Sequence, residues 1–232
     1  PTESGPDINR ETFKRKRRSW TRPQTIVCPS NWIADQARTS MLTKNWPIRV
    51  IPNAIDTDYW KPVDATSWSA QAGLGAGVPL ILFGAGAGLK DFHKGGDLFL
   101  ESVNLLAQKE LAGRDEVLVG VFGQSGDNFR IGPISVRFLG RLDDESLRRA
   151  YSRARVMVVP SRIDNFPSTA VEAQACGCPV VAFDTGGMPD IVEHGRSGLL
   201  CKPFHPEQLA QGISALLNDL ALAQKMGAYG RE

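Results

Sequence analysis

The chain has 232 residues, of which 42% are hydrophobic and 22% charged, and its net charge is +2. This composition is typical of a folded globular protein and excludes a disordered chain. Because the net charge is small, we expect no nucleic acid partner bound through charge over the whole surface. The apolar runs 156–160 and 179–183 are much shorter than the ~20 residues of a membrane span.

The ends of the chain and its cysteines suggest its context. The chain begins at Pro1 without a methionine and stops at Glu232 inside a helical pattern, so we expect a piece of a longer protein. No signal peptide is recognisable, and we expect a cytoplasmic location. The cysteines form no CxxC pair and are interpreted as small buried residues of a reducing compartment. They are Cys28, Cys176, Cys178 and Cys201.

The first part of the chain is predicted to hold two strands and a helix. They are Thr25–Pro29, Asn31–Leu42 with Ser30 as N-cap, and Ile48–Ile51. Residues 61–77 are rich in Gly, Ala, Ser and Pro, which is typical of a linker or of a surface excursion of the chain. All five tryptophans precede residue 70, and this change in composition supports a boundary between residues 60 and 78.

From residue 78 onward, short apolar strands alternate with helices. This alternation predicts an α/β fold, a Rossmann-like parallel sheet with helices on both faces, whose ligands bind at the carboxyl ends of the strands. The predicted strands are 80–83, 117–122, 136–139, 156–159, 180–183 and 198–201. The predicted helices are 96–108, 144–153, 168–176 and 189–194, with more after Pro206.

The stretch from Pro160 to Gly187 carries the clearest chemistry. Asp164 follows a strand, and Glu172 lies eight residues later in the next helix. The first amides of that helix, at Ser168 and Thr169, are suited to a phosphate. Two carboxylates beside such a helix start suit a ligand with an anionic middle and hydroxyl-rich ends. Either acid alone is better explained as a turn cap or a surface residue, but the two together favour a site.

Three further motifs are weaker. Lys94 stands at a glycine-flanked helix start, where it could neutralise a phosphate. The turn 84–88 has the spacing GxGxG rather than GxGxxG, so glycines such as Gly86 are interpreted as permitting close approach of a ligand, not as a nicotinamide site. Asp56-Thr57-Asp58 looks like a DxD metal motif but has no third ligand, so a turn is favoured and no metal or other cofactor is expected.

Four segments together resemble the retaining GT-B glycosyltransferases of family 4, the glycosyl transferases group 1. They are VCPSNWIAD, IRVIPNAIDTDYWKP, FLGRLDDESLRRAYSRARVMVVPS and PSRIDNFPSTAVEAQACGCPVVAFDTGGMPDIVEHGRSGLL. The resemblance runs from about residue 25 to 218. It implies that 1–60 is the tail of the N-terminal, acceptor-side domain and that 78–232 is the donor-binding domain.

The resemblance implies a role for each matching residue. Asp164 contacts the transferred sugar, Glu172 holds the ribose hydroxyls, and Lys94 neutralises the leaving diphosphate; these are the catalytic candidates. Leu142 lies beside the base. The remaining donor-binding candidates are Gly86 and the loop residues Asn165, Phe166, Ser168 and Thr169. Where the family has an arginine after the first strand, this chain has Ala85 and Gly86, and Lys90 is a candidate replacement.

These features predict a hexosyltransferase-type glycosyltransferase. It would move a sugar from a UDP-sugar or GDP-sugar to a saccharide or lipid-linked acceptor with retention, in polysaccharide or glycolipid biosynthesis, and the isolated piece would be inactive. Two alternatives stay open: a nucleotide-sugar epimerase of the same fold, and a non-catalytic module that only binds a nucleotide sugar. The scarcity of histidines argues against the epimerase.

Residues 10–22 carry seven basic side chains and one acid, Glu11. Three interpretations stay open for this segment. It is a solvated helix face, a contact with the anionic inner face of a membrane, or a site for an anionic acceptor.

Overall fold

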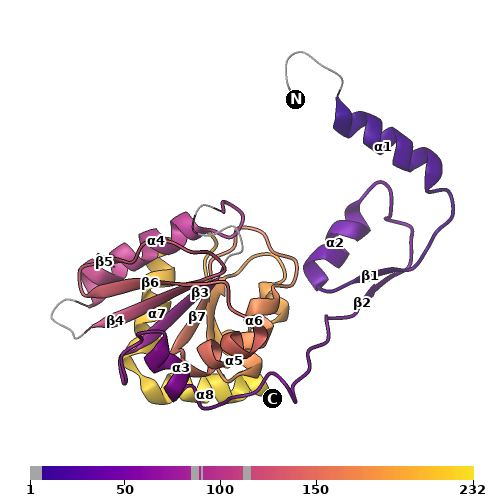
Figure 1. Ribbon diagram of the computed structural model, residues 1–232. Coiled ribbons are helices and arrows are strands. Elements are labelled where there is room, and N and C mark those ends of the chain that lie inside the picture. Colours follow the sequence, from indigo (N-terminus) through magenta and orange to yellow (C-terminus); the bar gives the residue numbers. More distant parts are fainter. Residues whose placement is uncertain (1–6, 85–88, 90, 112–115) are drawn as a thin grey trace. The chain divides into compact units, whose positions relative to one another are not determined.

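The computed structural model describes residues 7–84, 89, 91–111 and 116–232. The chain divides into two compact units, residues 1–53 and 54–232 (Figure 1). The predicted candidates Gly86 and Lys90, together with Ala85, lie outside the described residues.

The first unit contains two helices and two short strands. They are α1 (Ile8–Ser19), β1 (Ile26–Cys28), α2 (Asn31–Thr39) and β2 (Ile48–Val50), and the two strands pair in parallel. The hydroxyl of Ser30 accepts a hydrogen bond from the Ile33 amide at 3.4 Å, which confirms the predicted N-cap of α2. No residue of the basic helix α1 is buried.

The described part of the second unit is built on a seven-stranded sheet with the order β5-β6-β4-β3-β7-β8-β9. Each neighbouring pair is parallel except the antiparallel pair β5–β6. The bounds are β3 (Leu80–Gly84), β4 (Val117–Phe122), β5 (Phe129–Ile131), β6 (Ile134–Gly140), β7 (Val156–Val159), β8 (Val180–Phe183) and β9 (Gly198–Cys201).

Helices cover both faces of this sheet (Figure 1). Side chains alternate along β3, so Ile81 and Phe83 face one apolar cluster while Leu80 and Leu82 face the other. The first cluster is closed by α4 (Gly96–Leu105), α7 (Pro206–Asn218) and α8 (Leu220–Arg231), and the second by α3 (Thr66–Gln71), α5 (Asp144–Arg153) and α6 (Ser168–Ala175). The predicted fold class is therefore confirmed.

The order of the strands fixes where a ligand can sit. From β3 the chain moves outward through β4 and β6, and then returns to place β7 on the other side of β3. The loops after β3 and β7 therefore diverge at the carboxyl edge of the sheet, the position at which open parallel sheets bind their ligands.

The segment 61–77 differs from the linker that its composition predicts. It contains helix α3, and the side chains of Trp68 and Leu74 are 8% and 2% exposed in the core of the second unit. The structural division falls after Asn53, earlier than the predicted boundary. The helix α3 packs against α5, and the burial of Trp68 and Leu74 in the same apolar cluster fixes the segment in spite of its linker-like composition.

Two local predictions also change, and one strand is missed. The helix expected over 189–194 is only a 3₁₀ turn, η3 (Met188–Asp190), and the helix expected over 96–108 passes into a π-helical turn, η2 (Leu106–Glu110). The edge strand β5 has no sequence signal because it is three residues long and largely exposed. The four cysteines are buried and free, as predicted.

Within the described residues, every helix is too short or too polar to reach across a lipid bilayer.

Phe99 tests the packing of α4 on the sheet. Its ring stacks on Phe83 with centroids 4.5 Å apart, and it is fully buried. Phe99→Ala is expected to lower the free energy of unfolding by about 3–5 kcal/mol in urea denaturation, through lost burial and the cavity left behind. Phe129→Ala, on the exposed edge strand, is the control and is expected to cost about 1 kcal/mol or less. Equal losses in the two variants would contradict this packing.

Candidate functional site

A pocket of about 260 Å³ opens at the carboxyl ends of four strands of the sheet, β3, β4, β6 and β7. It lies at the divergence of the loops after β3 and β7, as the strand order requires. Its walls are formed by Phe83, Gly84, Lys94, Phe122, Gly123, Arg141, Leu142, Leu147, Val159, Pro160, Ser161, Asp164 and Thr169. Four of the predicted site residues, Lys94, Leu142, Asp164 and Thr169, therefore share one pocket.

An ion pair stands in this pocket. Nζ of Lys94 lies 2.5 Å from Oδ2 of Asp164, although the two residues are 70 positions apart. The Lys94 side chain is 39% exposed and that of Asp164 is 15% exposed, so an entering ligand can reach both. The ammonium can bind an anionic oxygen, and the carboxylate can accept hydrogen bonds from hydroxyl groups.

Two glycines let the loops that carry this pair approach each other. Gly95, directly after Lys94, has φ +68°, and a β-carbon there would collide with the backbone carbonyl of Pro160. Gly186 has φ +60°, and a β-carbon there would collide with the carbonyl of Asp164. The neighbouring Gly187 donates its N–H to that same carbonyl at 2.9 Å. Backbone therefore packs on backbone on both sides of the ion pair, and only glycine fits.

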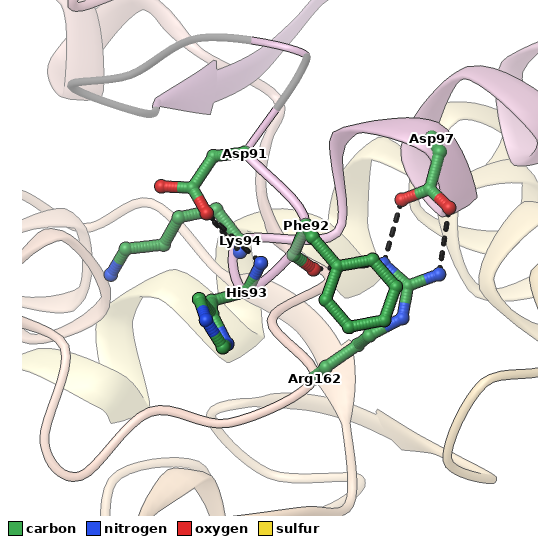
Figure 2. A network of polar contacts seen from close by, with 6 residues as sticks. All are labelled: Asp91, Phe92, His93, Lys94, Asp97 and Arg162. Carbon is green, nitrogen blue, oxygen red and sulfur yellow. Dashed lines mark hydrogen bonds and ion pairs between the residues drawn. The ribbon is translucent and has the colours of Figure 1, made fainter. Parts of the chain in front are cut away.

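The turn that presents Lys94 is also fixed from within. The carboxylate of Asp91 accepts hydrogen bonds from the backbone N–H groups of His93 at 2.9 Å and Lys94 at 3.3 Å (Figure 2). Such an Asx turn holds the backbone in the form that leads into α4.

The amino end of α6 forms another side of the pocket. Pro167 precedes the helix and Thr169 lines the pocket wall, while Ser168 is exposed. The first amides of a helix have no partner within the helix, and they point along its axis with a partial positive charge. The pocket therefore combines an ammonium group, a helix amino end and a carboxylate.

Glu172 lies beside this pocket and not in its wall. Tyr151 of α5 donates its hydroxyl to Oε2 of Glu172 at 3.1 Å, and Ser168 also hydrogen-bonds to the carboxylate. Burial raises the pKa of Glu172, while these two hydrogen bonds oppose the rise. Burial, followed by the adjacent Glu172 charge, raises the pKa of Tyr151 well above its usual value, so the phenol remains a donor.

The other predicted site residues have different positions. Asn165 and Phe166 are half-buried in the loop between Asp164 and α6, outside the pocket wall. Asp56 Oδ1 accepts hydrogen bonds from the amides of Asp58 and Tyr59, so the DxD sequence is a turn, as favoured from the sequence. In the described ranges, no three acidic, histidine or cysteine side chains gather as metal ligands do.

Sequence reasoning missed several residues of this region. Arg141 and Leu147 line the pocket, Tyr151 binds Glu172, and Arg162 holds the turn that carries Lys94. Arg141 and Leu147 stand after the predicted strand 136–139, so the rule that ligands bind at strand ends could have indicated them. Tyr151 and Arg162 have partners that are distant in the sequence, and no local pattern identifies them.

Comparisons with known proteins agree with this geometry. Residues 87–232 match the family Glycosyl transferases group 1. D-inositol 3-phosphate glycosyltransferase of Nocardiopsis dassonvillei is 31% identical over 212 residues, which cover 86% of this chain and 49% of that protein. Sucrose-phosphate synthase of Thermosynechococcus elongatus has a TM-score of 0.74 at 25% identity, covering 96% of this chain and 56% of that one.

A further solved structure, Anabaena Alr3699/HepE in complex with UDP and glucose, has a TM-score of 0.71 at 20% identity, covering 96% of this chain and 60% of that one. At that identity the likeness shows the fold alone. The chain spans about half the length of the curated relatives it matches. Since the family match extends over more than half of the chain, the protein belongs to the glycosyl transferases group 1 family.

Proposed function

We propose that this chain is the donor-binding part of a retaining glycosyltransferase that uses a nucleoside-diphosphate sugar, in polysaccharide or glycolipid biosynthesis. The observation that carries the proposal is the accessible pair Lys94–Asp164 beside the amino end of α6. A solved neighbour of the same fold was crystallised with UDP and glucose, which supports the nucleotide class. The first unit, residues 1–53, would be the end of the acceptor-side domain, and the isolated chain would bind the donor without transferring its sugar.

In this proposal the pocket acts mainly by electrostatics. During transfer the bond between the anomeric carbon and the diphosphate breaks, and negative charge grows on the diphosphate oxygens. The first amides of α6 stabilise that charge because they are fixed at the helix end before the donor binds, and the Lys94 ammonium stabilises it by turning from Asp164 to a phosphate oxygen. A bond forms from the acceptor oxygen to the anomeric carbon, and the acceptor proton passes to the departing phosphate. Asp164 accepts hydrogen bonds from the sugar hydroxyls.

Glu172 is assigned to the ribose hydroxyls. It lies one helical turn beyond Ser168, and the Ser168 hydroxyl links it to the helix end beside the pocket. Burial disfavours the charged form of this carboxylate, so the carboxylate adds little to the stability of the fold. Such a low contribution is expected where a group is retained for binding.

Lys94→Ala tests the diphosphate site. Calorimetry of the chain against UDP, GDP and the two nucleosides is expected to show that one diphosphate binds more tightly than its nucleoside. Lys94→Ala is expected to weaken that diphosphate roughly tenfold, since a charge-assisted contact is lost, and to leave the nucleoside unchanged. Lys225→Ala, on the exposed face of α8, is the control. Equal binding of both diphosphates and their nucleosides to the wild-type chain would contradict the proposal.

Asp164→Asn separates the two members of the ion pair. Without ligand, the Asp164 carboxylate competes with a diphosphate for the Lys94 ammonium. The substitution is therefore expected to strengthen binding of the free nucleoside diphosphate by a few-fold and to weaken the additional affinity that the sugar provides. Calorimetry with UDP and UDP-glucose, or GDP and GDP-mannose, measures both effects. If the nucleoside diphosphate and the nucleotide sugar lose affinity by the same factor, Asp164 lies outside the sugar site.

Glu172→Gln tests the role of the buried acid through its pH dependence. The raised pKa means that folding disfavours the charged form, so stability is lost as pH rises from the unfolded pKa through the folded pKa. Glutamine stays neutral and can still accept from Tyr151. We therefore expect a higher Tm than the wild type at pH 7 and no difference below about pH 4, where both side chains are neutral.

The same Glu172→Gln variant is expected to bind the nucleoside diphosphate more weakly. Glu101→Gln, at an exposed position on α4, serves as the control for both measurements. A lower Tm at pH 7 together with unchanged nucleotide affinity would assign Glu172 a structural role only.

A further inference from the structure

We propose that Arg162 is a positioning residue that holds the Lys94 turn at the pocket, an inference that rests on the proposed diphosphate site. Arg162 stands two residues before Asp164, in the loop after β7, and its side chain is 17% exposed. It does not line the pocket, so it would act on a ligand only through another residue.

The guanidinium of Arg162 connects two other parts of the chain, the start of α4 and the turn before Lys94, to the loop after β7. Nη1 and Nη2 bind the two carboxylate oxygens of Asp97, in the first turn of α4, each at 2.7 Å. Nη1 also donates to the backbone carbonyl of Phe92 at 2.8 Å, and the guanidinium lies 4.1 Å from the centroid of the Phe92 ring. Figure 2 shows Arg162 between Phe92 and Asp97, with the Lys94 side chain extending away on the other side of the turn.

A hydrogen bond between backbone groups also joins the loop after β7 to the Lys94 turn. The N–H of Arg162 donates to the carbonyl of His93, the residue directly before Lys94, at 2.9 Å. The turn is therefore held on one side by Arg162 and followed by Gly95, which packs against the Pro160 carbonyl. Because Lys94 directly follows His93 and Asp164 stands two residues after Arg162, these contacts of Arg162 limit how far apart the two backbones lie.

Arginine is the side chain that this junction requires. A planar guanidinium can bind a carboxylate with two parallel hydrogen bonds, donate to a carbonyl and stack on a ring at the same time, which a lysine ammonium cannot do. The Arg162 hydrogen bond is also the main reason that the pKa of Asp97 is lowered, so the pair stays charged near neutral pH.

Stability and positioning predict different results for Arg162. The Asp97 side chain is 59% exposed, and ion pairs at such sites contribute little to the free energy of unfolding. A small displacement of a catalytic group, in contrast, can cost far more in binding to a developing charge. A positioning role therefore predicts a large change in ligand affinity with a small change in Tm.

The matched control is Arg196, which also joins an acid and a ring. Its Nη1 lies 2.5 Å from Oε1 of Glu193, and its guanidinium lies 4.1 Å from the centroid of the Tyr229 ring. Arg196 is not in the pocket wall. Arg162→Gln and Arg196→Gln thus each remove an ion pair and a ring contact, at a mostly buried and at an exposed position respectively.

The experiment is a double-mutant cycle measured by calorimetry with UDP and GDP. Arg162→Gln is expected to bind the preferred diphosphate roughly tenfold more weakly, with an unchanged affinity for the nucleoside. In the Lys94→Ala background, Arg162→Gln is expected to have no further effect, because it acts through Lys94. Arg162→Lys should not restore affinity, and Arg196→Gln should match the wild type.

Two results would overturn the inference: wild-type affinity in Arg162→Gln, or the full tenfold loss repeated in the Lys94→Ala background. If the wild-type chain binds neither diphosphate, the proposed function fails instead. Hydrogen exchange of the amides 92–95 then tests the connection without ligand. Faster exchange in Arg162→Gln than in Arg196→Gln supports it, and equal exchange overturns it.

Discussion

The ammonium of Lys94 and the carboxylate of Asp164 meet where the loops after β3 and β7 diverge, and the arrangement of this region serves that contact. A parallel sheet whose order reverses beside β3 provides the opening. Residues 70 positions apart in the chain are thereby placed 2.5 Å apart, with both charges open to a ligand. The pair keeps the Lys94 side chain in the pocket, within reach of an entering anion.

Several features hold that contact in place, and their residues Gly95, Gly186, Asp91 and Arg162 lie outside the pocket wall. Gly95 and Gly186 remove the β-carbons that would separate the loops. Asp91 shapes the turn, and Arg162 ties it to the first turn of α4. In a separate contact, Tyr151 of α5 holds Glu172 of α6 in a region where burial disfavours its charge. The energetic cost of keeping charged groups close together and partly buried is offset by the apolar clusters on both faces of the sheet.

The sequence was sufficient for the parts of the fold that depend on local pattern. Apolar runs such as 80–83 and 156–159 predict buried strands, and the structure has β3 and β7 there. The anion site at Lys94 stays a prediction. Composition failed at 61–77, where one buried tryptophan overrides a linker-like sequence. Spacing placed Glu172 on the helix after Asp164 but could not predict that its carboxylate would turn toward Tyr151. Arg162 and Asp97 are 65 residues apart, and only tertiary structure brings such pairs together.

The most direct measurement is a crystal structure of the chain with the nucleoside diphosphate that it binds. We expect the diphosphate in the pocket at the ends of β3 and β7, with Lys94 Nζ turned from Asp164 to a phosphate oxygen and the first amides of α6 directed at the same group. A nucleotide bound elsewhere, with the Lys94–Asp164 pair still closed, would contradict this expectation.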